Sequence, residues 1–343
     1  MNYKILSEYP NEDLLAKWND FLANARFPTH YVTPNFFVDP FVRGGERFVV
    51  LAFDENEKIA AILSGVDDGR KIVSGLFVRP QTAFRKDADK RQAAGTLLAG
   101  LKAKGGERLE LIDLHSWEQI DEFKDLDFLG ERAEGANTII MLDLTKGADR
   151  IFKEFSQTRR NEIRKFLKQN QVLIAEIENA DELAELYAIH RDWNERKGNE
   201  PDTFESFKLA FEQKDYRKIF IAKHDGKIIA GSYYRFCAGG VIEYAANNSL
   251  VEYQKLRPND LLGWHSIEWA CRAGFAHYSM GGSHLFLRRF GGYELKTYRY
   301  RLDRSFLRIH NLKENVRNFG LKTYRNLPLS VKTRIKQFAG KVR

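Results

Sequence analysis

A strongly basic segment, residues 155–170 with the sequence FSQTRRNEIRKFLKQN, contains side chains suited to hold an anion. Helical geometry places residues four apart on one face, so Arg160, Arg164 and Lys168 form a cationic stripe. The apolar residues of the segment can point into a core at the same time. Guanidinium groups bind phosphate well, so the stripe fits a diphosphate or an RNA backbone. The alternative is a solvated helix face without a ligand.

Metal, redox and nucleotide-loop chemistry find no support in the sequence. The eight histidines are scattered, and no HExxH motif occurs. Cys237 and Cys271 are too few for a disulfide framework or a cysteine-based zinc site, so we expect buried thiols. The chain has no Walker loop, dinucleotide-binding glycine motif or nucleophilic serine elbow. We therefore predict no metal.

The composition predicts a globular protein of two domains, because 343 residues with 43% hydrophobic side chains exceed what one core usually supports. Residues 1–148 contain 19 Lys and Arg against 24 Asp and Glu, whereas residues 304–343 contain 11 basic side chains and one acidic. The net charge of +8 therefore lies mostly in a C-terminal tail and favours anionic partners. The opening residues do not resemble a signal peptide, and no window resembles a membrane span. We expect a cytoplasmic protein.

One pattern of strands and helix occurs twice. Residues 48–75 and 219–245 each have the pattern of a three-stranded antiparallel meander. KIIA and AGG in the second segment correspond to KIAA and DDG in the first. A helical pattern follows each meander, at 91–104 and at 258–273, and a strand follows each helix. The repetition predicts two related α/β domains in tandem, with a boundary near residues 144–149. Chance similarity of two hairpins is the alternative.

The order of meander, helix and strand resembles the GNAT acyltransferase fold. Its tandem occurrence resembles the FemAB-type aminoacyltransferases and the CelD-like acetyltransferase-domain proteins. The segments that carry the resemblance are YVTPNFF, TRRNEIRKFLKQN, YAIHRDWNERKGNEP, RPNDLLGWHSIEWACRAGF, YSMGG and FLRRFGGYELKTYRY.

The resemblance implies an α/β (α+β) fold of two tandem GNAT-like domains with mixed, mainly antiparallel sheets and a basic helical C-terminal tail. The predicted divisions are an acceptor-side domain at 1–145, a donor-side domain at 146–303 with its basic helix at 150–170, and an extension at 304–343. Two departures from the family pattern are visible. Ser279 replaces an Asp, and Leu287 replaces the Lys of a Phe-Lys pair. Arg288 or Arg289 could substitute for that Lys.

The resemblance also implies a donor site at the start of the helix in KLRPNDLL, where free backbone N–H groups and the helix dipole favour the pyrophosphate of an acyl donor. Arg257 could contact the phosphate, and Asn259 or Asp260 could line the same site or cap the helix. Simple helix capping, without a ligand, is the alternative. In YAIHRDWNERKG, Arg196 could reach the same cleft as the basic stripe.

The chemistry implied by the resemblance needs a base and an oxyanion donor on the strand GVIEYAANNS. Glu243 lies where GNAT enzymes often carry a carboxylate base. Strand alternation places Glu243 and Tyr244 on opposite faces, so only one of them lines the cleft. Asn247 could donate to an oxyanion, although such residues are also ordinary turn formers.

These features together predict an N-acyltransferase that moves an acyl group from acyl-CoA to an amine acceptor, a cell-envelope precursor of polysaccharide or peptidoglycan. Leu287 favours acyl-CoA over aminoacyl-tRNA, the donor in the alternative of a FemAB-type peptidoglycan aminoacyltransferase. A further alternative is a noncatalytic adaptor that binds RNA or membrane on a degenerate GNAT fold.

The C-terminal tail suggests a further partner. It carries one apolar helical face, with basic residues around it, that resembles a membrane-surface helix: Val331, Ile335, Phe338 and Val342. The tail would then attach the protein to the inner face of the membrane. The alternative is a helix packed on the second domain.

Overall fold

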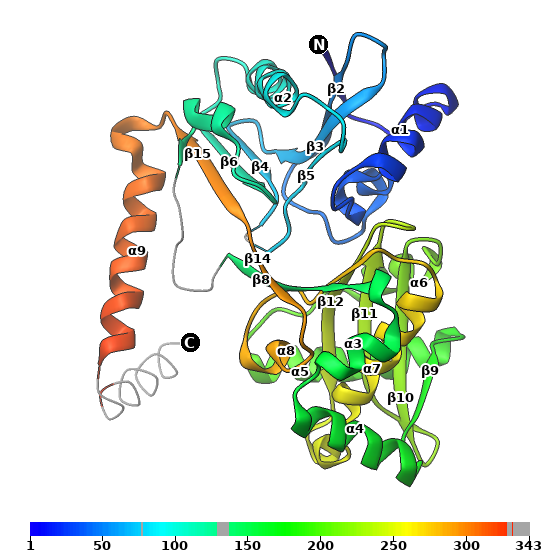
Figure 1. Ribbon diagram of the computed structural model, residues 1–343. Coiled ribbons are helices and arrows are strands. Elements are labelled where there is room, and N and C mark those ends of the chain that lie inside the picture. The colour runs from blue at the N-terminus through cyan, green and yellow to red at the C-terminus, as the bar shows by residue number, and fades with distance from the viewer. Residues whose placement is uncertain (77, 129–136, 328–330, 332–343) are drawn as a thin grey trace.

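The computed structural model describes residues 1–76, 78–128, 137–327 and 331. Two twisted sheets, one above the other in Figure 1, each carry helices on both faces. The sheets are mixed and mainly antiparallel, and this α/β architecture is the predicted fold class.

The first sheet has the strand order β1-β2-β3-β4-β6-β15-β7, and β5 pairs separately with β3. Its strands are β1 (Asn2–Leu6), β2 (Glu46–Phe53), β3 (Ile59–Asp67), β4 (Lys71–Ser74), β5 (Thr82–Phe84), β6 (Leu111–Ser116), β7 (Asp127–Phe128) and β15 (Tyr298–Asp303). Helix α1 (Glu12–Asn24) packs Trp18 and Phe21 against one face, in a cluster with Val49 and Leu51 of β2. Helix α2 (Lys90–Gly105) covers the other face, because alternate residues of β2 point there.

The second sheet has the order β14-β8-β13-β12-β11-β10-β9. Its strands are β8 (Thr138–Asp143), β9 (Leu173–Glu176), β10 (Arg217–His224), β11 (Lys227–Phe236), β12 (Val241–Ser249), β13 (His277–Ser279) and β14 (Tyr293–Lys296). One face carries α3 (Ala148–Glu154), α4 (Gln157–Gln169), α7 (Pro258–Arg272) and α8 (Leu285–Arg288) around a large aromatic core. The other face carries α5 (Ala180–Lys197) and α6 (Phe204–Glu212) in a separate cluster.

The two sheets have the same topology, as the repeated pattern predicts. In each, an antiparallel meander is followed by a helix and by a strand parallel to the last meander strand: β4 with β6, and β12 with β13. An antiparallel strand then joins each of these, β15 beside β6 and β8 beside β13.

Sheet membership crosses the predicted domain limits. Strand β8 precedes residue 145 yet pairs with β13 and β14 of the second sheet. Strand β15 ends at residue 303, inside the predicted second domain, yet pairs with β6 and β7 of the first sheet. Each half of the chain thus contributes one strand to the sheet of the other, which ties the halves together at two places.

Local signals explain where the main helices of the second half begin and end. The side chain of Ser156 accepts from the amide of Arg159 at the start of α4, and Asn170 ends that helix in the left-handed conformation. Helix α5 is capped by the side chain of Asn179 and ends at Gly198, whose φ of 71° suits glycine.

The last described helix, α9 (Ile309–Asn326), projects along the side of the molecule (Figure 1). It follows β15 and leaves several apolar side chains exposed. The predicted apolar face of the tail, apart from Val331, lies outside the described residues.

Candidate functional site

Strands β12 and β13 diverge at the centre of the second sheet. They pair in parallel only from Val241 to Glu243, opposite His277 to Ser279, and β12 continues to Ser249. Among the described strands, β12 has no further partner on that side. A β-bulge at Ala245 bends this free end, because Tyr244 pairs with Tyr234 while Ala246 pairs with Tyr233. The sheet therefore opens along one edge of β12.

The turn after β13 closes the base of this opening. Gly281 has a φ of +68°, and a Cβ there would lie 2.6 Å from the carbonyl oxygen of Tyr244. Only glycine allows so close an approach with that backbone conformation. Ser279, the replacement for the family's Asp, is fully buried beside Glu243 in the strand register.

Glu243 and Tyr244 lie on opposite faces of β12, as alternation requires. The Glu243 side chain is 2% exposed, and its carboxylate accepts a hydrogen bond of 3.3 Å from Nε of Arg235. The Tyr244 ring lies 5.9 Å from that of Tyr234 on the α7 face, and burial raises the pKa of Tyr244 well above its ordinary value. The Tyr244 hydroxyl therefore keeps its proton at neutral pH.

The asparagines after the bulge also divide between the faces. Asn247 pairs with Ser232, whose hydroxyl accepts from Tyr234, so Asn247 shares the α7 face with Tyr244. Asn248 faces α5, where its side chain lies 3.1 Å from Nδ1 of His190. The structure thus brings Tyr244 and Asn247 together and places Glu243 on the other face.

Helix α7 begins beside the free end of β12. Arg257 precedes it in the left-handed conformation, with φ 57°, and no side chain caps the helix. Asn259 instead donates to Ser249 Oγ at 3.3 Å, and Asp260 is buried, so neither acts as the predicted cap. Arg257 pairs with Asp260 at 2.7 Å and with Glu162 of α4.

A second arginine under this helix start was not predicted. Arg159 of α4 is 1% exposed, pairs with Asp260 at 2.9 Å, and lies 4.3 and 3.9 Å from the ring centroids of Phe286 and Phe290. Burial lowers the pKa of Arg159 to about 10 and raises the pKa of Asp260. Phe155 and Ile163, both buried, lie four residues before and after Arg159, and that spacing could have identified it.

The predicted basic stripe on α4 mainly contacts α3. Arg160 donates to the carbonyl oxygens of Lys153, at 2.9 Å, and of Phe155, and Arg164 lies 5.3 Å over the Phe152 ring. Lys168 is exposed. Arg196 pairs with Asp192 at 2.9 Å on α5, which covers the opposite face of the sheet. The structure therefore does not bring Arg196 to the stripe.

Helix α8 carries the positions of the family's Phe-Lys pair. The Leu287 side chain is 3% exposed and belongs to the aromatic core. Arg288 donates to the carbonyl oxygen of Ser283 at 2.6 Å and pairs with Glu294. Arg289 is exposed, and its charge helps to lower the pKa of Arg159. Of the two arginines that could substitute for the lysine, Arg289 is therefore the one close to Arg159.

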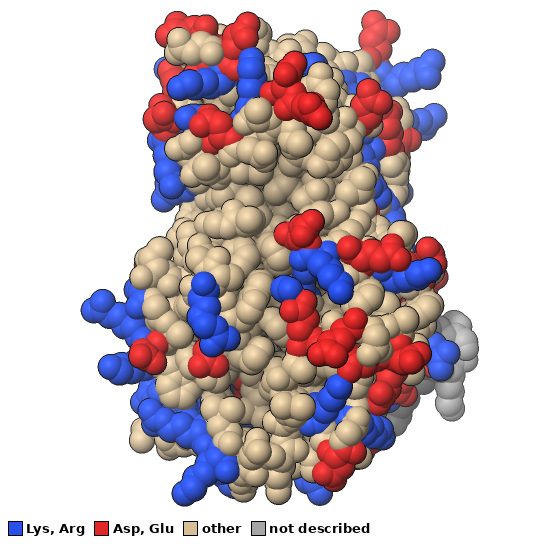
Figure 2. Space-filling model, turned by 90° about the vertical axis from the view of Figure 1, so that its right-hand side faces the viewer, with Lys and Arg blue, Asp and Glu red and all other residues tan. Residues whose placement is uncertain are grey.

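A cavity of about 270 Å³ lies where the two halves meet, on the Glu243 face of the second sheet. The first half contributes Phe41 and Arg79 to its lining, and the second half contributes Arg217, Tyr233 and Arg235, among others. Figure 2 shows the outer surface narrowing between the halves, where mostly uncharged residues lie. No local sequence pattern identifies this group of residues, because its members come from separate segments.

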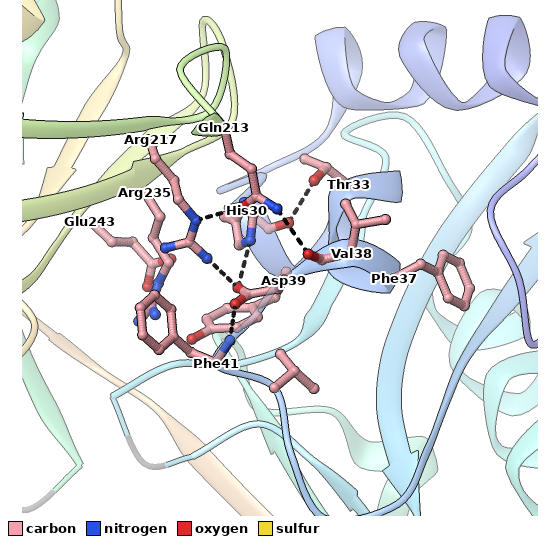
Figure 3. Close-up of polar contacts among 12 residues, drawn as sticks. His30, Thr33, Phe37, Val38, Asp39, Phe41, Gln213, Arg217, Arg235 and Glu243 are labelled. Carbon is pink, nitrogen blue, oxygen red and sulfur yellow. Dashed lines mark hydrogen bonds and ion pairs between the residues drawn. The ribbon is translucent and has the colours of Figure 1, made fainter. Parts of the chain in front are cut away.

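A buried ion-pair network fixes this junction (Figure 3). Asp39 is fully buried and pairs with His30 Nε2 at 2.8 Å and Arg217 Nη2 at 2.7 Å, and it accepts from the Phe41 amide at 2.8 Å. Although burial opposes it, the bond from His30 and the charge of Arg217 hold the pKa of Asp39 below its usual range. The 3-10 turns of the first half, η1 (His30–Val32) and η2 (Pro34–Val38), are thereby fixed against β10.

In the part of the chain that the structure describes, no group of three or more His, Cys, Asp or Glu side chains is arranged to hold a metal ion. The same residues include no helix with the length and apolar character needed to cross a membrane.

Comparison with known proteins agrees with the fold of the second half. Residues 153–298 match the family model for the acetyltransferase (GNAT) domain. Comparison of the sequence with curated proteins gives no significant match.

Three solved structures share the fold across most of the chain. FemX has a TM-score of 0.67 at 13% identity, over 92% of this chain and 100% of its own. L-PGS from Bacillus licheniformis has a TM-score of 0.57 at 15% identity, over 91% and 98%. A tandem GNAT protein from the clavulanic acid biosynthesis pathway has a TM-score of 0.52 at 10% identity, over 89% and 99%. At these identities the likeness establishes the fold.

Proposed function

We propose that this acyltransferase of the GNAT superfamily, a tandem protein of the FemAB type, transfers an acyl group from acyl-coenzyme A to an amine acceptor. The observation that carries the proposal is the divergence of β12 from β13 next to the uncapped start of α7. The free edge of β12 offers backbone groups to an extended acyl-pantetheine chain, and the helix start offers an anion site.

The donor pyrophosphate lies, in this proposal, at the start of α7. Without a donor, Arg257 pairs with the carboxylates of Glu162 and Asp260. When the donor binds, the Arg257 guanidinium binds a phosphate in their place, in a bidentate manner. Asn259 and Asp260 line the same turn, and Arg289 adds an exposed cation. The buried Leu287 supports acyl-coenzyme A over aminoacyl-tRNA, since it leaves no lysine at that position.

The two faces of β12 serve the two substrates. The amine nitrogen attacks the thioester carbon, a C–N bond forms, and the C–S bond breaks. Glu243, on the cavity face, takes the proton from the amine, directly or through a water. Tyr244, on the donor face, protonates the departing thiolate, and Asn247 donates to the oxyanion of the tetrahedral intermediate.

The acceptor is proposed to be an amine on a cell-envelope precursor, of polysaccharide or peptidoglycan. Support comes from the fold that the chain shares with FemX and with L-PGS. The cavity between the halves is the place for this acceptor, because it adjoins Arg235, the partner of Glu243.

Thermal-shift titration with acetyl-coenzyme A and with an aminoacyl-tRNA tests the donor. We expect saturable stabilisation by the coenzyme A ester. Thiol release is then followed with glucosamine and with a lysine-containing muramyl peptide as amines. Stabilisation by the tRNA alone would favour the FemAB-type aminoacyltransferase, and binding of neither donor would reject the proposal in favour of an adaptor.

The described part of the tail supports attachment to an anionic membrane surface. On α9, Leu312, Val316 and Phe319 are 54, 64 and 74% exposed, at helical spacing, with Lys313 and Arg317 beside them. The acid on this helix, Glu314, pairs with Arg299 and Arg301 of β15.

Cosedimentation with phosphatidylglycerol vesicles, against phosphatidylcholine vesicles, tests this attachment. We expect Phe319→Glu to weaken binding to the anionic vesicles about tenfold and Lys17→Glu in α1 to leave it unchanged. Equal binding to both kinds of vesicle, or self-association through α9 in their absence, would contradict it.

A further inference from the structure

The cavity between the halves gathers three arginines that the proposed reaction does not use. Arg217 of β10 and Arg235 of β11 are 7 and 4% exposed, and Arg79 of the first half donates to the carbonyl oxygen of Ala245 at 3.1 Å. Each comes from a different segment, so the fold, and not a local motif, brings them together. Figure 3 shows Arg235 between Glu243 and Arg217, with Asp39 beside Arg217.

The buried carboxylates at this place are fewer than the guanidinium groups. Asp39 pairs with Arg217, and Glu243 pairs with Arg235, whereas Arg79 donates to a neutral carbonyl. The charge of Arg235 is the main reason that the pKa of Arg79 is lowered, which reflects two cations held close together. Burial lowers the pKa of His30, so that imidazole adds no positive charge at neutral pH.

The outer charges of the cavity are matched. Asp202 lies 3.4 Å from Arg43, and Lys218 lies 2.5 Å from Glu176. The described residues around the cavity therefore carry an excess of one positive charge, located at Arg79 and its neighbour Arg235. Arg235 is buried and Arg79 is partly exposed, so water offsets only part of this charge, and holding the rest without a counter-charge is costly.

Two further polar groups at the cavity lack a hydrogen-bond partner among the described residues. They are Nη2 of Arg235 and the hydroxyl of Tyr233, both buried and both on the same face of β11. Buried donors are almost always satisfied, so each indicates a bound group or water. The remaining lining is largely apolar, with Phe41, Phe207 and Ile219.

We propose that this cavity binds an oxyanion with one negative charge, a carboxylate or a phosphodiester, carried by the amine acceptor. Arg79 and Arg235 bind the oxygens through their N–H groups, Tyr233 donates its hydroxyl, and the apolar walls hold the adjoining carbon groups. The assignment of this anionic group to the acceptor substrate rests on the proposed function. It would place the acceptor amine toward Glu243, on the same face of β12.

The cavity volume permits such a group. About 270 Å³ is several times the roughly 30 Å³ that a water molecule takes in the liquid, so the site holds an oxyanion and part of its carrier. Arg79 comes from the first half and Arg235 from the second, so binding requires both halves in their present arrangement.

Thermal-shift titrations with sodium acetate and with dimethyl phosphate, at constant ionic strength, test the site, and neutral acetamide serves as the control ligand. We expect saturable stabilisation by at least one anion and none by acetamide. The anion that binds more tightly identifies the class, carboxylate or phosphodiester.

Two variants locate the binding. Tyr233→Phe removes a hydroxyl that has no hydrogen-bond partner among the described residues, so we expect the fold to be retained and the dissociation constant to rise about fivefold. Arg79→Gln should raise it at least tenfold. Arg70→Gln is the matched control, because Arg70 is exposed and pairs with Glu110 at 3.3 Å on the same half.

The outcome separates this inference from the proposed function. Unchanged anion affinity in both Tyr233→Phe and Arg79→Gln, or no saturable binding by either anion, overturns the cavity assignment. Acetyl-coenzyme A titrations of the same variants report the donor site independently. If anions bind as expected but no coenzyme A ester binds, the cavity stands and the acyl-coenzyme A function fails.

Discussion

The two halves repeat one topology, but they differ at the place where a donor would bind. All four residues of β4 pair with β6, from Lys71–Leu111 to Ser74–Leu114, whereas β12 runs six residues past its pairing with β13. Helix α2 is capped by Asp89, which accepts from the amides of Arg91 and Gln92, whereas α7 starts at Arg257 without a side-chain cap. A carboxylate therefore occupies the anion site of the first half. The two halves therefore share a fold, but only the second half has the features of the proposed donor site.

The halves also differ in what their central helices bury. The buried face of α2 consists of Ala, Leu and Gly residues, whereas α7 buries Asp260 in an ion pair with Arg159 of α4. The first half, however, contributes Arg79, Asp39 and Tyr31 to the face of the second sheet that carries Glu243. The second half thus contains the donor opening, and the first half completes the acceptor cavity.

The largest expected effect concerns the buried ion pair of the second half. Arg159→Met should lower the free energy of unfolding by about 3 kcal/mol, because Asp260 then keeps a buried charge with one partner fewer. Arg164→Met is the control on the same helix, and it should cost less than about 1 kcal/mol because Arg164 is exposed. Urea denaturation measures both. Equal losses of unfolding free energy in the two variants would mean that the Arg159–Asp260 pair does not stabilise the second half more than an exposed arginine does.

The next largest expected effect is on the affinity of the proposed donor site. Arg257→Gln should weaken acetyl-coenzyme A binding at least tenfold, because a phosphate partner is lost, whereas Arg91→Gln at the start of α2 should leave the affinity unchanged. Isothermal titration calorimetry measures both constants. The comparison of the halves fails if Arg91→Gln weakens binding as much as Arg257→Gln.

The junction between the halves should respond to pH through His30. Burial lowers the pKa of His30 in the folded protein, so its contribution to stability is present above the unfolded pKa of about 6.5 and is lost as pH falls below it. The titratable groups that face it are Asp39, Arg217, Arg235, Tyr31 and Tyr216.

The measurement compares wild type with His30→Gln, which does not titrate. Between pH 7.5 and 5.5 the wild type should lose about 1 kcal/mol more of unfolding free energy than the variant. The other histidines with lowered pKa values are common to both proteins, so the difference belongs to His30. Parallel profiles would show that His30 is charged in the folded junction.

Local sequence patterns predicted the helices and strands well, but they did not predict which strands pair across the two halves. Both meanders and the helices after them were confirmed, because alternation and helical spacing are properties of neighbouring residues. The exchange of β8 and β15 was not predicted, since a short apolar strand reads the same whichever sheet it joins.

The candidate site shows the same limit. Glu243 and Arg257 could be chosen from their own segments, and their catalytic and binding roles stay predictions. Arg79, Arg217 and Arg235 could not be chosen, because only the fold brings them to one cavity. On α4, the choice of Arg160 over Arg159 missed the buried position by one residue, about 100° of helix rotation.

The smallest effect tests whether the cap alone separates the halves. Asp89→Ala should cost about 1 kcal/mol of stability, because two amides at the start of α2 lose their acceptor. It should not create a second donor site, because β4 is paired along its whole length with β6 and offers no free edge to a pantetheine chain. Calorimetry of the variant should therefore still give one acetyl-coenzyme A per chain. A stoichiometry of two would show that the cap, rather than the opening beside β12, decides where the donor binds.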